Sequence, residues 1–374
     1  MIGLVNANLA VSIMEDNDTL LSYQNIIKKE RIAFIDYIKA FAIILVVLSH
    51  INAYNENLKI WTMSFSIPLF FIAHGMVYKW RVKKLSQFGE FLNKKFVAFL
   101  IPYAVWAFIY AGYSPENVVK IAYGSHESLS LAGSLTSLWF LPCIFTVDVI
   151  FEIILFISAK LKNQNIFILI FTILALAITA FIPHLSKGWP FELDVAVQCF
   201  AFTSIGYLVF PKIKSIREKA EKDKFVLVIL GMVTVISAAL TSLAYKNVSM
   251  PGGYVMSAEA RYGFYPIYLI CAVAGSVLFI CICLLLEKVK IKSFQKLMAF
   301  IGQNTMMIFI LQKPFIHLMQ PLCKRINLNG IIALILILAV TIALCLIASV
   351  FVNAYIYVLS GRGKVPCKNV RDRS

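Results

Sequence analysis

The sequence lacks the long polar stretches from which a soluble domain is built. Only 14% of its 374 residues are charged, 60% are hydrophobic, and the mean hydropathy is +0.82. Soluble proteins are about 45–50% apolar, so this composition predicts an integral membrane protein. Internal repeats and low-complexity tracts are also missing, which predicts one membrane domain over residues 31–359.

Cysteine patterns typical of metal sites and disulfide frameworks are absent too. None of the eight cysteines belongs to a CxxC pair. Six lie in or beside apolar stretches: Cys143, Cys199, Cys271, Cys281, Cys283 and Cys345. We interpret them as packing residues, and we expect no disulfide framework, no structural zinc and no other metal site.

The first thirty residues lack the basic n-region of a signal peptide. Glu15, Asp16 and Asp18 instead make part of this segment acidic. We expect residues 1–30 to form a disordered cytoplasmic tail, with Met1 and Met14 as alternative starts. Residues 360–374 are expected to form a basic cytoplasmic tail.

Ten apolar stretches are long enough to cross a bilayer as helices. The predicted fold is therefore all-α, a polytopic membrane protein of about ten transmembrane helices. The stretches lie at 33–53, 62–79, 96–113, 138–158, 165–182, 193–210, 225–244, 264–286, 298–319 and 329–359.

The basic residues indicate the orientation. Of the 35 lysines and arginines, 26 lie in the tails and in alternate loops, and seven lie in the remaining loops. Because cytoplasmic loops carry the excess of basic residues, this split predicts that both termini are cytoplasmic. The net charge of +16 does not indicate a nucleic-acid partner, since the basic residues form short clusters between apolar stretches.

The first apolar stretch, residues 31–52, contains three ionisable residues, Asp36, Lys39 and His50. On a helix, Lys39 and His50 lie within about 20° of each other and about 16 Å apart along the axis. Asp36 lies about 40° from His50 on the same surface. Each residue alone fits an interfacial or packing role, but three on one face favour a functional site.

Other polar residues lie within the apolar stretches. His74 fits a packing or hydrogen-bonding role better than a direct one. Asp148 and Glu152 are four residues apart, so they form either a second polar cluster or, for Glu152, a contact with headgroups. Pro314 predicts a helix break, with Lys313 as a local donor to the freed carbonyl groups. Residues 112–138 form the longest predicted external loop, which would cover an acceptor site or simply be solvated.

Several stretches together resemble the membrane-bound acyltransferase family 3, in particular its fucose 4-O-acetylase-like branch of polysaccharide O-acetyltransferases. The likeness covers about residues 31–357 and rests on RIAFIDYIKAFAIILVVLSH, IPLFFIAHGMVY, FLIPY, LWFLP and IGQNTMMIFILQKPF. The family pattern of a basic residue, ten intervening positions and a histidine corresponds to Lys39 and His50. The family usually has arginine at the first position, and lysine cannot make the same bidentate phosphate contact.

The resemblance implies that His50 is catalytic and that Lys39 helps to bind an acyl-CoA donor. We add Asp36 to the catalytic set and Arg31 to the donor-binding set because of their positions on the same stretch. Possible oxyanion or acceptor contacts are Asn304, Gln303, Gln312 and Trp139. The family often has a histidine where Gln312 stands.

The expected function is transfer of an acyl group, most simply acetyl, from cytoplasmic acyl-CoA to a sugar or glycan hydroxyl. Acetyl-CoA would be a donor substrate, no bound cofactor is expected, and the protein would lie in the plasma membrane. A neutral imidazole suits general-base action, and an acyl-histidine intermediate is the alternative. A transporter, a flippase or a glycan polymerase are the competing functions, but no inverted repeat supports a transporter.

Overall fold

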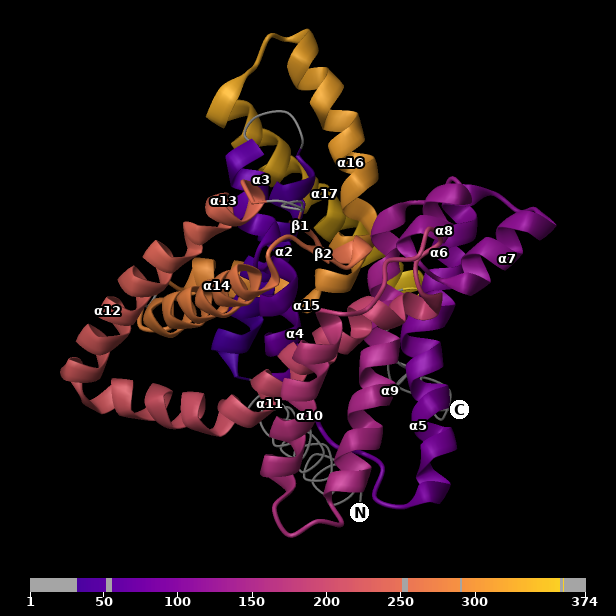
Figure 1. Ribbon diagram of the computed structural model, residues 1–374. Helices are drawn as coiled ribbons and strands as arrows, with labels where there is room; N and C mark the ends of the chain where they lie inside the picture. Colours follow the sequence, from indigo (N-terminus) through magenta and orange to yellow (C-terminus); the bar gives the residue numbers. More distant parts are fainter. Residues whose placement is uncertain (1–31, 52–55, 251–254, 290, 357–358, 360–374) are drawn as a thin grey trace, which may run out of the picture.

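The computed structural model describes residues 32–359 except 52–55, 251–254, 290 and 357–358. This part of the chain is almost entirely helical (Figure 1), which confirms the all-α prediction. One short hairpin interrupts it, in which β1 (Val255–Met256) pairs antiparallel with β2 (Arg261–Tyr262). The seven cysteines in the described part are buried and free, in agreement with packing roles.

The helices of the first half are α2 (Ala33–His50), α3 (Glu56–Met63), α4 (Ser66–Met76), η1 (Leu85–Gln87), α5 (Phe88–Lys95), the π-helical turn η2 (Phe96–Leu100), α6 (Ile101–Ala111), α7 (Pro115–Tyr123), α8 (His126–Leu131), η3 (Thr136–Trp139), α9 (Phe140–Ser158) and α10 (Gln164–Thr179). Those of the second half are η4 (Pro190–Glu192), α11 (Leu193–Lys222), α12 (Lys224–Thr241), α13 (Leu243–Val248), η5 (Ser257–Glu259), α14 (Tyr265–Leu286), α15 (Lys292–Gln303), α16 (Thr305–Arg325) and α17 (Gly330–Tyr355).

All ten predicted stretches lie largely in helices. Within the described residues, seven helical segments are long and apolar enough to cross a membrane: Ala33–His50, Leu85–Ala111, Thr136–Ser158, Pro190–Lys222, Lys224–Val248, Tyr265–Leu286 and Gly330–Tyr355. The chain is therefore a multi-pass membrane protein. The count of ten crossings and the cytoplasmic position of the termini stay predictions.

Helix α2 lies in the middle of the molecule, where α4, α14, α15 and α16 pack against it (Figure 1). Of the residues of α2, 67% are buried within the protein, whereas only 17% of the residues in the apolar part of the Lys224–Val248 segment are buried. Most of α2 is therefore enclosed by other helices: Asp36 is buried, and Lys39 and His50 are half-buried. Helix α12 presents most of its surface outward.

Three glycines allow helices to approach each other closely. A Cβ at Gly302 of α15 would lie 2.0 Å from the carbonyl oxygen of Asp36 in α2. Gly75 of α4 and Gly206 of α11 have the same role at the α4–α11 crossing, where added Cβ atoms would lie 1.9 and 2.0 Å from backbone oxygens. Small residues at such crossings let the backbones of membrane helices pack directly.

The ninth predicted stretch, 298–319, is not one helix, because the chain turns at Asn304 between α15 and α16. The Asn304 amide oxygen accepts a hydrogen bond from Ser349 of α17 at 2.7 Å, and its amide nitrogen donates to the Phe300 carbonyl oxygen at 2.7 Å. The predicted break at Pro314 is wrong, since α16 continues through Pro314. The side-chain bonds of Asn304 fix the corner there. Ile316, two residues after Pro314, is buried, so α16 continues in the packed interior beyond the proline.

Helix α11 extends to Lys222, well past the predicted end of the sixth apolar stretch at residue 210. Its last part is rich in charged residues, so hydropathy marks the apolar portion and not the end of the helix. Arg217 there makes a bidentate pair with Glu287, next to the end of α14, at 2.6 and 2.9 Å. This planar pair ties the two helix ends together.

Candidate active site

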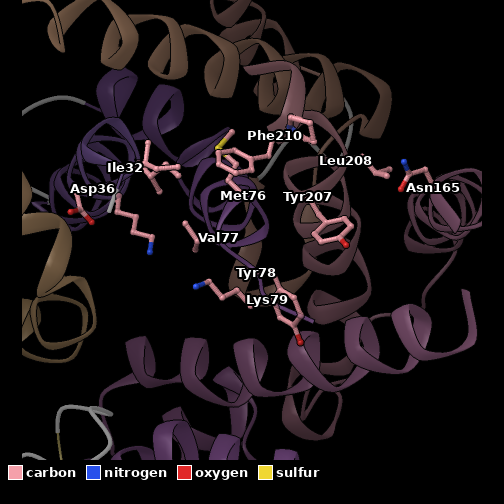
Figure 2. A pocket seen from close by; sticks show the side chains of 13 residues that line it. Ile32, Asp36, Met76, Val77, Tyr78, Lys79, Asn165, Tyr207, Leu208 and Phe210 are labelled. Carbon is pink, nitrogen blue, oxygen red and sulfur yellow. The ribbon is translucent and has the colours of Figure 1, made fainter. Parts of the chain in front are cut away.

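The ionisable residues of α2 line a series of adjoining cavities. The first, here the Asp36 cavity, has a volume of about 490 Å³. Its lining comes from α2, from the segment after α4, from α10 and from α11 (Figure 2). Its polar lining residues are Asp36, Lys39, Lys79, Asn165, Tyr78 and Tyr207.

A second cavity of about 160 Å³, the His74 cavity, lies beside the first and shares Lys39 with it. His74 is a further polar lining residue. Most of the remaining lining is apolar, and Phe140 and Phe309 form part of it as a stacked pair with ring centroids 4.5 Å apart. Lys39 is thus a wall residue of both cavities.

The third cavity, of about 60 Å³, surrounds the end of α2 and is called the His50 cavity. It shares Phe309 with the His74 cavity. Its polar lining includes His50, His126, Thr136, Ser137, Trp139 and Lys313. Shared residues therefore connect the surroundings of Asp36 to those of His50 along α2.

Segments outside the long helices contribute to the lining of the His50 cavity: Met256 and Ser257 come from the hairpin and η5, and His126 comes from α8. The backbone N–H of His126, the first residue of α8, donates to the carboxylate of Glu192. Glu192 is 1% exposed and lies in a left-handed turn with φ 55°, directly after Phe191 with φ 53°. Two consecutive residues in this region are unusual outside glycine, and they direct the chain into α11 with the carboxylate facing inward.

His126 is neutral near pH 7. Burial, and then the neighbouring Lys313 ammonium, lower the pKa of His126 to about 4. Its Nδ1 atom and the Ser137 hydroxyl are buried and have no hydrogen-bond partner among the described residues. Both residues line the His50 cavity, so they offer it polar atoms that the fold itself does not use.

The predicted cluster of buried acids is present, and the alternative that Glu152 reaches headgroups is wrong. Asp148 and Glu152 of α9 are both 0% exposed. Asp148 contacts His74 Nε2 at 2.7 Å and Lys95 Nζ at 2.6 Å. Tyr78 donates its hydroxyl to Glu152 at 2.7 Å. The predicted hydrogen-bonding role of His74 is therefore confirmed by its bond to Asp148, and His74 also lies in the wall of the His74 cavity.

The structure brings some of the predicted site residues together. His50 and Trp139 line the same cavity, and Lys39 and Asp36 line another. Gln303 is exposed at the end of α15, and Gln312 is fully buried with its Nε2 3.4 Å from the Phe309 carbonyl oxygen. Neither these glutamines nor Asn304 line the His50 cavity, and Arg31 lies outside the described residues.

Lys313 is the main residue of this region that sequence reasoning did not assign to the site. Its Nζ donates to the Thr136 hydroxyl at 2.5 Å instead of to a local carbonyl. No acidic residue lies three or four positions away from Lys313 on α16. A lysine in an apolar helix without a helical partner is the sequence signal that would have indicated it.

Comparison with known proteins identifies the family of the chain. The family model described as the acyltransferase domain, of acyltransferase family 3, matches residues 32–350. Neither the curated proteins nor the solved structures include a match to this chain. The matched region runs from the start of α2 into α17 and includes all three cavities. The chain therefore belongs to the membrane acyltransferases of family 3.

Proposed function

We propose that this protein transfers an acetyl group from cytoplasmic acetyl-CoA to a hydroxyl of a cell-surface sugar or polysaccharide precursor at the plasma membrane. The observation that supports this best is the row of adjoining cavities along α2, with Lys39 and Phe309 as shared wall residues. Such a row suits a donor that enters at one end of α2 and an acceptor that enters at the other. The family gives the reaction class, acyl transfer.

The donor end would be the Asp36 cavity. Its volume of about 490 Å³ falls within the range of about 300–1,000 Å³ typical of ligand pockets. Lys39 and Lys79 supply positive charge, and Arg81 and Lys83 follow Lys79 in the sequence. Coenzyme A carries several phosphate groups, which such a cluster attracts. Its long pantetheine arm would extend from there along α2 toward His50.

The reaction would take place in the His50 cavity. The neutral His50 imidazole accepts the proton of the acceptor hydroxyl as the hydroxyl oxygen attacks the thioester carbonyl carbon. The tetrahedral intermediate then collapses, the C–S bond breaks, and the thiolate of coenzyme A takes the proton back from the imidazolium. Trp139 offers an apolar ring beside the acceptor position. An acyl-histidine intermediate on His50 is the alternative route.

The test is to compare purified wild type with His50→Ala in detergent. We measure melting temperature, release of free coenzyme A thiol from acetyl-CoA in the presence of glycan acceptors, and the acetyl mass on the acceptor. We expect His50→Ala to melt like wild type and to lose about 10²–10⁴ in rate. His184→Ala, a change at an exposed histidine outside the three cavities, is the control and should stay active.

A stable His50→Ala protein that still acetylates would refute the assignment of His50. Mass spectrometry of cell-surface glycans with and without the gene extends the test to the acceptor, because loss of the gene should remove an ester-labile acetyl mass.

A further inference from the structure

Lys313 is a cation without an anionic partner in the His50 cavity. Among the described residues, no carboxylate oxygen lies within the 4.0 Å that defines an ion pair with its Nζ. Of the described residues that line this cavity, Lys313 is the one with a full charge near neutral pH. A half-buried ammonium in an apolar helix is costly unless an opposite charge compensates it at some stage of the protein's work.

Within the part of the chain that the structure describes, the hydrogen-bond partner of Lys313 is neutral. The Thr136 hydroxyl at the start of η3 accepts from Nζ at 2.5 Å. An ammonium has three N–H donors, so this contact fixes the position of the group and leaves two donors for a ligand. η3 also carries Ser137 and Trp139 into the same cavity wall. The ammonium is thus held beside His50 in advance, which is what transition-state stabilisation requires.

We propose that the Lys313 ammonium stabilises the oxyanion of the tetrahedral intermediate formed during acyl transfer. This inference rests on the proposed function. As the acceptor oxygen bonds to the thioester carbon, the carbonyl π electrons move onto the carbonyl oxygen, and the negative charge appears there. The two unused N–H groups of Lys313 donate to that oxygen until the C–S bond breaks and the carbonyl forms again. The charge of the lysine is unchanged over the cycle.

The amides expected from sequence are poorer candidates for this role. The Asn304 amide oxygen is bound by Ser349, and its amide nitrogen by the Phe300 carbonyl oxygen. Gln312 is fully buried and does not line the His50 cavity. A cation is also a stronger partner for an oxyanion than a neutral amide.

A purely structural role is the competing explanation, because the Lys313–Thr136 bond also connects α16 to η3. The two explanations differ in what Thr136 does. If the bond serves only to hold η3, Thr136→Val should be as harmful as removal of the lysine. If the charge is needed for the reaction, Thr136→Val should only loosen its position.

The experiment measures melting temperature, kcat and KM for acetyl-CoA in Lys313→Met, Lys313→Arg and Thr136→Val. Loss of one oxyanion donor typically costs about 10²–10³ in kcat. We expect that loss in Lys313→Met with KM within a few-fold of wild type, about ten-fold or less in Thr136→Val, and partial activity in Lys313→Arg. Lys324→Met, at an exposed lysine in the last turn of α16, is the matched control and should behave as wild type.

Two results would overturn the inference alone. The first is that wild type is active and the kcat of Lys313→Met lies within about three-fold of the wild-type kcat. The other is an equal loss of kcat and melting temperature in Lys313→Met and Thr136→Val. If Lys313→Met does not fold, the same comparison is made with Lys313→Gln, which removes the charge but keeps a polar end to the side chain. A wild type that transfers no acyl group at all would refute the proposed function itself, which separates the two failures.

Discussion

The buried carboxylate of Asp148 allows a quantitative test of how charge is held inside this protein. Its side chain is 0% exposed and contacts two cationic or ionisable groups, Lys95 at 2.6 Å and His74 at 2.7 Å. Lys95→Met removes one counter-charge and keeps an unbranched apolar side chain of similar length. The carboxylate would then be left in the interior with His74 as its remaining side-chain partner.

The expected loss of stability follows from this geometry. Removal of one partner from a buried ion pair typically costs about 3–5 kcal/mol. Because His74 still bonds to Asp148, we expect the low end of that range for Lys95→Met, about 3 kcal/mol. Asp148→Asn should cost less, about 1–2 kcal/mol, because the Lys95 side chain is 18% exposed and its ammonium can turn toward water. The double variant should cost less than the sum by about 1–3 kcal/mol.

The assay is equilibrium unfolding of wild type, both single variants and the double variant in mixed detergent micelles. Lys94→Met is the control, since Lys94 is the adjacent residue on α5 and its ion pair with Glu90 is exposed. It should leave the unfolding curve unchanged. Equal stabilities for Lys95→Met and Lys94→Met, or strictly additive single variants, would refute the argument that the Lys95–Asp148 pair is a coupled, buried interaction.

Two further predictions concern packing and pH. Gly302→Ala should force α15 away from α2, because its Cβ would lie 2.0 Å from the Asp36 carbonyl oxygen. The control is Gly89→Ala, where nothing lies within 4 Å of an added Cβ. We expect Gly302→Ala to have the lower melting temperature of the two, and equal melting temperatures would contradict the prediction. The lowered pKa of His126, about 4 against an ordinary 6.5, means that the unfolded chain binds the proton more readily. Stability should therefore fall as the pH drops from about 6.5 to 4, by on the order of 3 kcal/mol at most from this group. The melting temperature should fall less over that pH range in His126→Gln than in wild type. An equal fall in both proteins would count against the role of His126.

Hydropathy predicts the helices well because bilayer-length apolar stretches have few other ways to fold. It fails where the ends of helices depend on distant residues. The turn at Asn304 is bonded to Ser349, which is 45 positions away, and the charged end of α11 is bonded to Glu287 through Arg217, 70 positions apart. Neither contact leaves a local pattern that a sequence window can detect.

The candidate site also contains one part that the sequence predicts and one part that it does not. Helix arithmetic is enough to put Asp36, Lys39 and His50 on one face of α2, because all three belong to one element. The identity of the residues opposite His50 depends instead on how α8, η3 and α16 meet, and this is decided by contacts such as Lys313 with Thr136, 177 positions apart. The neighbouring Pro314 led to the prediction that Lys313 donates to carbonyl groups of its own helix. Instead α16 continues through the proline, and Lys313 donates to Thr136 of η3.

Glu152, one of the two buried acids of α9, is bonded to the chain segment that lines the Asp36 cavity. Glu152 accepts hydrogen bonds from the Tyr78 hydroxyl at 2.7 Å and from the backbone N–H groups of Arg81 and Val82 at 2.7 and 2.5 Å. These bonds hold the segment after α4, which includes Lys79 in the wall of the Asp36 cavity. A carboxylate at this depth would be unfavourable alone, but here several donors satisfy it. Glu152 therefore holds the basic segment in position, so the placement of positive charge beside the Asp36 cavity is linked to an acid buried in α9.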